Sequence, residues 1–453
     1  MTFLFFSKNK HFKNISWAVI NSIAGVTISI LSSFFYLRVF SPEIFGSIVI
    51  EYLILSIGLI FSEFGLSGAI IQRNKVDSLI YKSFTLSFIT SILIGIIYLL
   101  YVSFFKYSQT SLIMSILILL SFTVNSFIIP YKNILSIKED YHCVSKFNFF
   151  SLALSHLLVI TIILSSNIPN IWMLFSQRLI MPLILFIFLF FHLKTFKVKF
   201  DFMFKELMSQ IGFGSKLMTS NLLETMYKQG LNVLFSFNSL LLGGLFLQAN
   251  RLTDVYNGLI FNISNTILFS RFIRLGTKNI FTIKKYFCYS LLLLTSIGII
   301  IMTYFGEIII GILYGEKWLG LPFVLSMLLL INYNVIIDNS VRSLFKSKRM
   351  GSQILTTEIL KKSLIVLVFI VFLEIPQIKI FIYSLTLVTS IGSFFTIYIA
   401  KKNIKEINFL NMFYITQINI ACSIFFIETT NIFPLIFISI YSIYNMYKIK
   451  ISK

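Results

Sequence analysis

Long apolar runs separated by short polar segments fill this sequence from end to end. The runs are about 20 residues long, the length of helix that crosses a bilayer core of roughly 30 Å. Transmembrane β-barrels show alternating strands of about 10 residues instead, and that pattern is missing. The apolar runs predict fourteen spans, at about 15–37, 44–66, 80–104, 110–130, 146–166, 169–192, 211–236, 240–268, 286–305, 321–341, 353–373, 377–400, 409–428 and 431–447.

Composition points to the same fold class. Hydrophobic residues make up 57% of the 453 residues and charged residues only 12%, about half the charge fraction of a soluble protein. We therefore expect an all-α polytopic membrane protein. The three cysteines, Cys143, Cys288 and Cys422, are far apart and odd in number, so we expect neither a disulfide framework nor a metal site.

The basic charge of the chain follows its predicted topology. With the N-terminus in the cytoplasm, 29 of the 38 Lys and Arg fall in cytoplasmic segments, four fall on the opposite side and five lie within spans. An excess of Lys and Arg in cytoplasmic loops is the usual bias of membrane proteins. We therefore expect both termini in the cytoplasm, a multi-pass protein of the cytoplasmic (inner) membrane, and no nucleic-acid partner for the net charge of +21.

The longest polar connection, at about 193–210, lies between the sixth and seventh predicted spans. Repeated halves are common in transporters. We therefore expect an N-terminal six-helix lobe at 1–200 and a C-terminal six-helix lobe at 201–405. Residues 406–453 would then add two further transmembrane helices.

Motifs for enzyme chemistry are missing from the sequence. There is no Walker A pattern and no HExxH, and the fragment GFGSKL at 212–217 lacks the third glycine of a dinucleotide-binding loop. We therefore expect neither an enzyme nor a bound cofactor. Without an ATP site, any transport would draw on an ion gradient or on the gradient of the substrate itself.

Charged residues inside the predicted spans are candidate functional residues, because each must face a partner or a water-filled cavity. Most of them have an opposite charge three or four positions away, so ion pairing along one helix explains these charges as well as a functional role does. The pairs are Glu224 with Lys228, Arg251 with Asp254, Asp338 with Arg342, and Glu358 with Lys361 and Lys362.

Arg178 and Glu51 have no such local partner. Arg178 lies about nine residues into the sixth predicted span, and guanidinium binds phosphate oxygens in a bidentate way. Glu51 lies about 10 Å inside the second span by helical rise. A carboxylate repels phosphate, so Glu51 is expected to bind a coupling H⁺ or Na⁺ or to form a structural pair, and Arg178 is the cation that it could pair with.

Several stretches resemble the polysaccharide transport family, the Wzx-type O-antigen and capsule flippases of the multidrug/oligosaccharidyl-lipid/polysaccharide (MOP) exporter superfamily. The sequence RVFSPEIFG at 38–46 is followed by EFGLSGAIIQR at 63–73, and ILYGEKW at 312–318 is the most specific match. Further matches are FGSKLMTSNLL at 213–223, LGGLFLQANRLTD at 242–254 and EILKK at 358–362. At 270–275 the sequence SRFIRL lacks the proline that is common in that family.

The resemblance implies a function as well as a fold. It implies about fourteen helices (twelve is the alternative) in two lobes around a central cavity, working by alternating access. The substrate would be an undecaprenyl-pyrophosphate-linked oligosaccharide, and a polysaccharide polymerase and a chain-length regulator would be partners beside membrane lipid. The candidate contacts to pyrophosphate or glycan are Arg178, Lys228 and Arg251, and the candidate ion-coupling residues are Glu51, Glu224 and Asp254.

Other functions stay open at this point. A MATE-like multidrug or cation exporter would favour a cavity dominated by carboxylates, whereas five Lys and Arg lie within the predicted spans. A membrane glycan polymerase would carry a sizeable catalytic loop outside the cytoplasm, and a lipid II flippase would bind a similar headgroup.

Overall fold

The computed structural model describes the chain over residues 10–63, 77–105, 109–138, 140–193, 199–202, 205–275, 277–347, 350–374, 377–403 and 410–430. These residues are almost entirely helical, and none of them lies in a β-strand. The chain divides into two compact units, Met1–Ser236 and Phe237–Lys453. The all-α fold class is therefore confirmed, while the lobe boundaries expected at 200 and 405 stay predictions.

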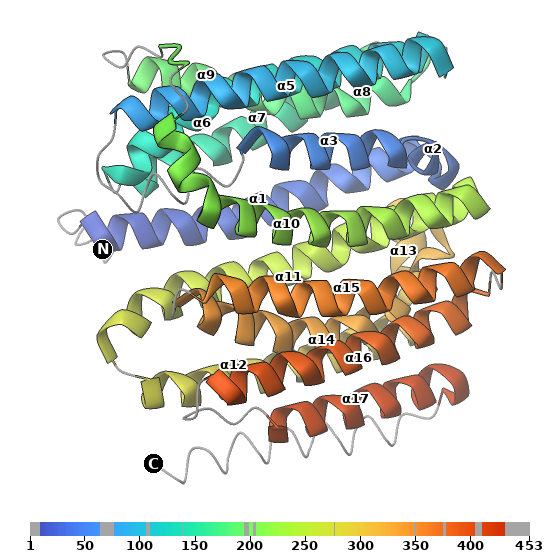
Figure 1. Cartoon of the computed structure of the whole chain (residues 1–453). Coiled ribbons are helices and arrows are strands. Elements are labelled where there is room, and N and C mark those ends of the chain that lie inside the picture. The colour runs from blue at the N-terminus through green and yellow to red at the C-terminus, as the bar shows by residue number, and fades with distance from the viewer. Residues whose placement is uncertain are drawn as a thin grey trace, which may run out of the picture. The chain divides into compact units, whose positions relative to one another are not determined.

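The first unit contains nine described helices. They are α1 (Lys10–Val39), α2 (Pro42–Ser47), α3 (Val49–Glu63), α5 (Asp77–Phe105), α6 (Gln109–Ile137), α7 (Tyr141–Ser165), α8 (Ile171–Phe175), α9 (Gln177–His192) and α10 (Lys205–Asn238), whose last two residues fall beyond the unit. Helix α6 packs against α5 and α9, and α7 packs against α1 and α9. Figure 1 shows α5, α6 and α9 running side by side.

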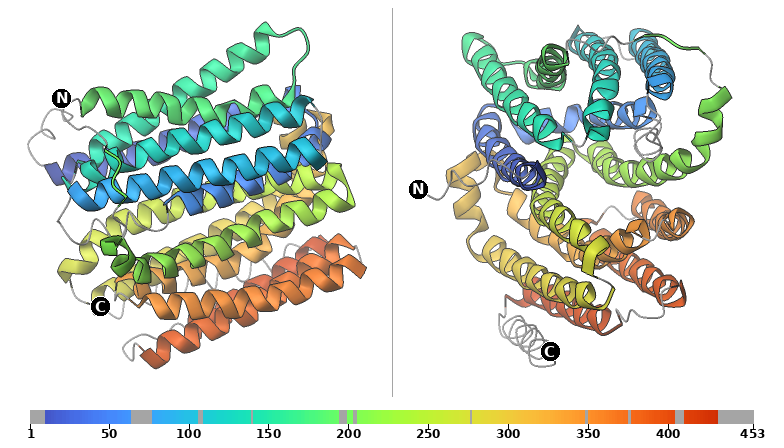
Figure 2. Two further views of the ribbon diagram at one scale, coloured as in Figure 1. Left: turned by 45° about the horizontal axis from the view of Figure 1, so that its top comes forward. Right: turned by 90° about the vertical axis from the view of Figure 1, so that its left-hand side faces the viewer.

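The second unit is built around one enclosed helix. Its elements are α11 (Leu240–Leu275), α12 (Thr277–Tyr304), α13 (Gly306–Tyr314), the 3₁₀ turn η2 (Glu316–Trp318), α14 (Leu321–Ser347), α15 (Gly351–Glu374), α16 (Ile378–Asn403) and α17 (Leu410–Thr429). Helix α14 contacts α11, α12, α15, α16 and α17, and 83% of its span is buried inside the protein. Polar groups on α14 therefore face protein rather than lipid. Figure 2 gives two further views of the helices.

The helices match the predicted spans in position. Each of the first thirteen predicted spans coincides with one of these helices or with a broken helix pair, and the fourteenth, at 431–447, lies outside the described residues. Within the described part of the chain, seven helices are long and apolar enough to cross a membrane, or eight if the bent pair of α12 and α13 counts as one span. The total of fourteen spans and the cytoplasmic location of the termini stay predictions.

Helices α10, α11 and α15 are not among those seven. They carry most of the charges that the sequence placed inside spans: Glu224, Lys228, Arg251, Asp254, Glu358, Lys361 and Lys362. Helices with such charges need a polar neighbour, because a charged side chain facing lipid is costly.

The polar connection after α9 is held against α5. The backbone N–H of Asp201 donates to Thr85 Oγ1 at 2.8 Å, and its carboxylate lies 3.9 Å from the ammonium of Lys82. The Phe200 ring lies 5.0 Å from Phe84 and 5.4 Å from Phe88, centroid to centroid. Residues 199–202 are thus a docked segment of the first unit.

Candidate functional site

A proline shapes the backbone at the first candidate, Arg178. Helices α8 and α9 are separated at Ser176, and Arg178 is the second residue of α9. Pro182 lies four residues later and has no N–H, so the carbonyl of Arg178 lacks its helical donor. Ser121 of α6 supplies the replacement, with its hydroxyl 2.9 Å from that carbonyl oxygen. A freed carbonyl in a membrane helix is commonly satisfied by a neighbouring Ser or Thr in this way.

The side chain of Arg178 stacks on an aromatic ring. Its guanidinium carbon lies 5.1 Å from the centroid of Tyr52 on α3, within the range of a cation–π contact. Tyr52 is buried and its ring packs 5.4 Å from Phe175, whereas Arg178 itself is exposed. The ring therefore orients a guanidinium that remains accessible.

Glu51 precedes Tyr52 on α3 and is enclosed. Only 5% of Glu51 is exposed, and Tyr98 of α5 donates a hydrogen bond to its carboxylate. The Tyr98 hydroxyl in turn accepts a hydrogen bond from Ser115 of α6. This predicted ion-coupling residue is thus a buried carboxylate that accepts a hydrogen bond from one hydroxyl of a neighbouring helix.

The other predicted residues lie on α10 and α11. Lys228 Nζ is 3.7 Å from Glu224 Oε1, and these two side chains are 43% and 36% exposed, so the predicted i,i+4 pair is confirmed. Arg251 is half-buried and Asp254 is exposed, one turn further along α11. Arg178, Glu51, Glu224 and Lys228 belong to the first unit, and Arg251 and Asp254 belong to the second.

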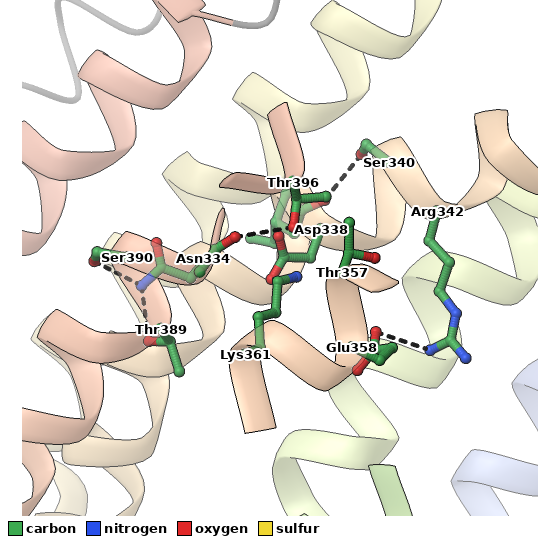
Figure 3. Close-up of polar contacts among 12 residues, drawn as sticks. Asn334, Asp338, Ser340, Arg342, Thr357, Glu358, Lys361, Thr389, Ser390 and Thr396 are labelled. Carbon is green, nitrogen blue, oxygen red and sulfur yellow. Dashed lines mark hydrogen bonds and ion pairs between the residues drawn. The ribbon is translucent and has the colours of Figure 1, made fainter. Parts of the chain in front are cut away.

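A buried ion-pair cluster joins α14 and α15 in the second unit, and residue spacing along the sequence does not reveal it. Lys361 Nζ lies 2.6 Å from Asp338 Oδ2, with the two side chains 8% and 21% exposed. The sequence placed Asp338 with Arg342, and that interpretation is wrong, because the carboxylate of Asp338 faces the next helix rather than the next turn of its own. Figure 3 shows Lys361 reaching toward Asp338.

Arg342 pairs with Glu358 of α15 instead of with Asp338. Arg342 NH1 lies 3.8 Å from Glu358 Oε1, and Lys362 Nζ lies 3.9 Å from Glu358 Oε2. The pair of Glu358 with Lys362 was predicted from their i,i+4 spacing, whereas Lys361 pairs with Asp338 of α14. These five side chains carry three positive and two negative charges, a surplus of one positive charge.

Uncharged polar groups extend the ion-pair cluster toward α16 and α17. The amide nitrogen of Asn334, one turn before Asp338, donates to Thr389 Oγ1 at 3.1 Å and to Ser390 Oγ at 3.0 Å. Gln417 of α17 donates from its side-chain amide to Asn334 Oδ1 at 3.4 Å. Figure 3 shows Asn334 pointing to the α16 hydroxyls, so polar contacts link α14 to three neighbours.

A glycine on α16 accommodates the stem of Lys361. A Cβ atom added at Gly392 would lie 2.5 Å from Lys361 Cγ, well inside van der Waals contact. The methylene chain of Lys361 therefore lies directly on the backbone of α16. The lysine is fixed at its ammonium by Asp338 and along its stem by this glycine.

The charges of the ion-pair cluster were visible in the sequence, but their partners were not. EILKK at 358–362 and Asp338 with Arg342 stand out in otherwise apolar spans. Spacing along one helix cannot reveal that α15 packs beside the end of α14. Among the residues that the structure describes, no group of three or more His, Cys, Asp or Glu could hold a metal ion.

Comparison with known families gives one match. The sequence matches the family described as "Polysaccharide biosynthesis protein" over residues 36–322, more than half of the chain. No curated protein matches the sequence.

Solved structures with a similar fold are membrane transporters. A lipid II flippase, MurJ, in its inward closed conformation superposes with a TM-score of 0.65 at 12% identity, covering 96% of this chain and 100% of that one. An inward-facing multidrug resistance MATE family transporter of the MOP superfamily superposes with a TM-score of 0.63 at 12% identity, covering 88% of this chain and 99% of that one. A MOP superfamily transporter from Pyrococcus furiosus superposes with a TM-score of 0.58 at 14% identity, covering 88% of this chain and 97% of that one. At these identities the likeness establishes the fold.

Proposed function

The chain belongs to the polysaccharide biosynthesis protein family, and from this membership we propose that it is a flippase for undecaprenyl-pyrophosphate-linked oligosaccharide repeat units. It would carry them across the cytoplasmic membrane by alternating access, for the synthesis of O-antigen, capsule or exopolysaccharide. The family match over 36–322 carries the proposal, because it points to polysaccharide synthesis rather than to drug efflux. A fold shared with a lipid II flippase supports a lipid-linked substrate.

The charges of the first unit suit the headgroup of such a substrate. Arg178 offers an exposed guanidinium on an aromatic ring, and guanidinium binds pyrophosphate oxygens in a bidentate way. Lys228 of the same unit is proposed as a further cationic contact to pyrophosphate or glycan, and so is Arg251, which belongs to the second unit. The half-exposed Lys228 keeps a partner in Glu224, so it can exchange one anion for another.

Ion coupling is the second part of the proposal. The enclosed carboxylate of Glu51 is the first candidate to bind a proton or sodium ion, because it is buried and accepts a hydrogen bond from the Tyr98 hydroxyl. Glu224 and Asp254 are the other proposed coupling residues. Both are more exposed than Glu51, so they would exchange ions with water more readily.

Two other functions use the same fold class. A MATE-like multidrug exporter is the nearer one, since a MATE transporter superposes almost as well as the lipid II flippase. A membrane glycan polymerase is the enzymatic alternative, and the transporters among the structural neighbours argue against it. A polysaccharide polymerase and a chain-length regulator are instead proposed as partners that use the product on the far side of the membrane.

A comparison of three substrates tests the proposal. Purified protein in liposomes is given a fluorescent undecaprenyl-pyrophosphate oligosaccharide, fluorescent lipid II or a lipophilic cationic dye, each with and without a pH or sodium gradient. Movement of the oligosaccharide lipid, with little of the dye, supports the flippase. Movement of the dye alone would replace the proposal with drug export.

A further inference from the structure

The chain turns sharply between α12 and α13. The two helices together are apolar enough for a membrane span, but they are bent by 78° at Phe305. A helix that leaves a span at such an angle runs nearly parallel to the membrane plane. Figure 1 shows α13 turned across the direction of its neighbouring helices.

One face of α13 is fixed to the start of α14. Gly306, Ile310 and Tyr314 are buried, and a Cβ atom at Gly306 would lie 2.5 Å from Pro322 Cβ. Gly315 then ends the helix with φ of +93°, a conformation that favours glycine. The orientation of α13 is therefore set by packing within the second unit.

The opposite face of α13 is apolar and exposed. Phe305, Ile308 and Ile312 are 56%, 63% and 66% exposed, and their spacing of three and four residues places them on one side of the helix. The charged side chains of this region, Glu307, Glu316 and Lys317, are exposed as well. An exposed apolar face beside charged groups is the pattern of a helix that lies in a membrane interface.

The exposed face of α13 continues an apolar stripe of α12. On α12 the exposed apolar residues recur at intervals of three and four: Leu294, Ile297, Ile301 and Tyr304. This interval places them along one side of α12, the side that a span of this apolarity presents to lipid. Phe305 follows Tyr304 directly, so the stripe passes from α12 onto α13 through the bend.

We propose that α13 is an interfacial helix that inserts Phe305, Ile308 and Ile312 among the lipids at the membrane surface where α12 ends. The predicted topology makes this the non-cytoplasmic surface. The bound partner is the lipid headgroup and upper acyl region, and neither the transported substrate nor a second protein is needed to cover the face. The inference does not depend on which substrate the protein carries.

Spin-label accessibility in lipid nanodiscs tests the proposal on the full chain. Single cysteines are introduced by Ile308→Cys and Ile312→Cys in a background in which Cys143, Cys288 and Cys422 are serine, and each is labelled with a nitroxide. Ile297→Cys on α12 is the matched lipid-facing control, and Glu316→Cys is the control at an exposed polar position. A monodisperse elution profile shows that each variant folds.

The expected result is a ratio of oxygen to nickel-chelate accessibility at 308 and 312 that is several-fold above the ratio at 316 and no higher than the ratio at the deeper position 297. A ratio at 308 and 312 equal to that at 316 would place α13 in water and overturn the proposal. Low accessibility to both oxygen and the nickel chelate would show that protein covers this face of α13, and it would also overturn the proposal. If the serine background does not fold, brominated-lipid quenching of an Ile308→Trp variant, compared with Glu316→Trp, decides between the same outcomes.

Discussion

Lys361 of α15 places its ammonium 2.6 Å from the carboxylate of Asp338 on α14. These residues are 23 positions apart in the sequence, so the pair joins two helices rather than two turns of one. The pair is largely buried, and its lysine stem lies against Gly392 of α16. Removing both charges from water costs free energy that offsets much of their attraction. The pair therefore adds little net stability, but it specifies that α14 and α15 pack with these two residues in contact.

Replacement of Lys361 by methionine is expected to destabilise the protein strongly. The variant leaves Asp338 buried without its cation, and loss of one partner of a buried pair costs about 3–5 kcal/mol. The double variant Lys361→Met with Asp338→Asn is expected to recover a large part of the loss, because no charge is then left alone. Thermal unfolding in detergent, followed by tryptophan fluorescence, measures the cycle.

The matched control is the pair of Lys379 with Glu428 on α16 and α17, which is 3.3 Å apart but 53% and 40% exposed. Exposed pairs contribute about 0–1 kcal/mol, so Lys379→Met is expected to change the unfolding temperature little. Equal falls in unfolding temperature for Lys361→Met and Lys379→Met would show that burial of the pair does not matter.

Gly392→Ala tests the contact between α16 and the lysine stem. The new methyl group would approach Lys361 Cγ to 2.5 Å, so the lysine or the helix has to shift, and overpacking typically costs about 1–3 kcal/mol. In a Lys361→Ala background the clashing atom is gone, and Gly392→Ala is expected to cost far less. Gly298→Ala is the control, because its Cβ would lie at an ordinary 3.5 Å from Leu329. If the losses of stability from Gly392→Ala and Lys361→Ala simply add in the double variant, the two residues are not in contact and this account is contradicted.

Ser121→Ala is expected to destabilise α9 through its backbone. The change removes the donor to the Arg178 carbonyl, which Pro182 leaves without a helical partner, and an unsatisfied buried acceptor costs about 1–3 kcal/mol. In a Pro182→Ala background the helical N–H is restored, so Ser121→Ala should then be nearly neutral. Thermal unfolding of the four proteins gives the coupling, and a cost that persists without the proline would contradict this account.

Helix positions follow closely from the sequence, because apolar length is a local property. The pairs of Glu224 with Lys228 and of Glu358 with Lys362 were also predicted from neighbouring residues. The sequence did not predict the bends. At the break between α12 and α13, Gly306 packs closely against Pro322 of α14, a contact between residues 16 positions apart that no local pattern reveals.

The partners of charged residues were the least predictable feature. Asp338 and Arg342 have ideal i,i+4 spacing, yet Asp338 pairs with Lys361 and Arg342 with Glu358. A contribution of about 0.3–0.5 kcal/mol from a pair on one helix is easily outweighed when a neighbouring helix presents an opposite charge. The aromatic support of Arg178 likewise comes from α3, which lies far away in the sequence.

Arg178→Ala is expected to reduce transport without loss of fold. The side chain is exposed, so its contribution to stability through Tyr52 is about 0.5–1 kcal/mol. Loss of charged hydrogen bonds to a pyrophosphate, worth about 1.5–3 kcal/mol, lowers the transport rate about tenfold or more. Arg178→Lys keeps the charge but not the planar fork and should be intermediate, while Lys146→Ala, an exposed cation on α7, is the control. Full transport by Arg178→Ala would remove this residue from the proposed site.

The most direct test of the proposed function is translocation itself. Liposomes with and without the purified protein receive a fluorescent undecaprenyl-pyrophosphate oligosaccharide in both leaflets, and a membrane-impermeant quencher is added outside under an imposed pH or sodium gradient. A lipid-linked oligosaccharide flippase predicts that the signal protected in the inner leaflet falls rapidly in the protein-containing liposomes and stays constant in the empty ones. Identical protected signals in both, under every gradient and with several glycans, would contradict it.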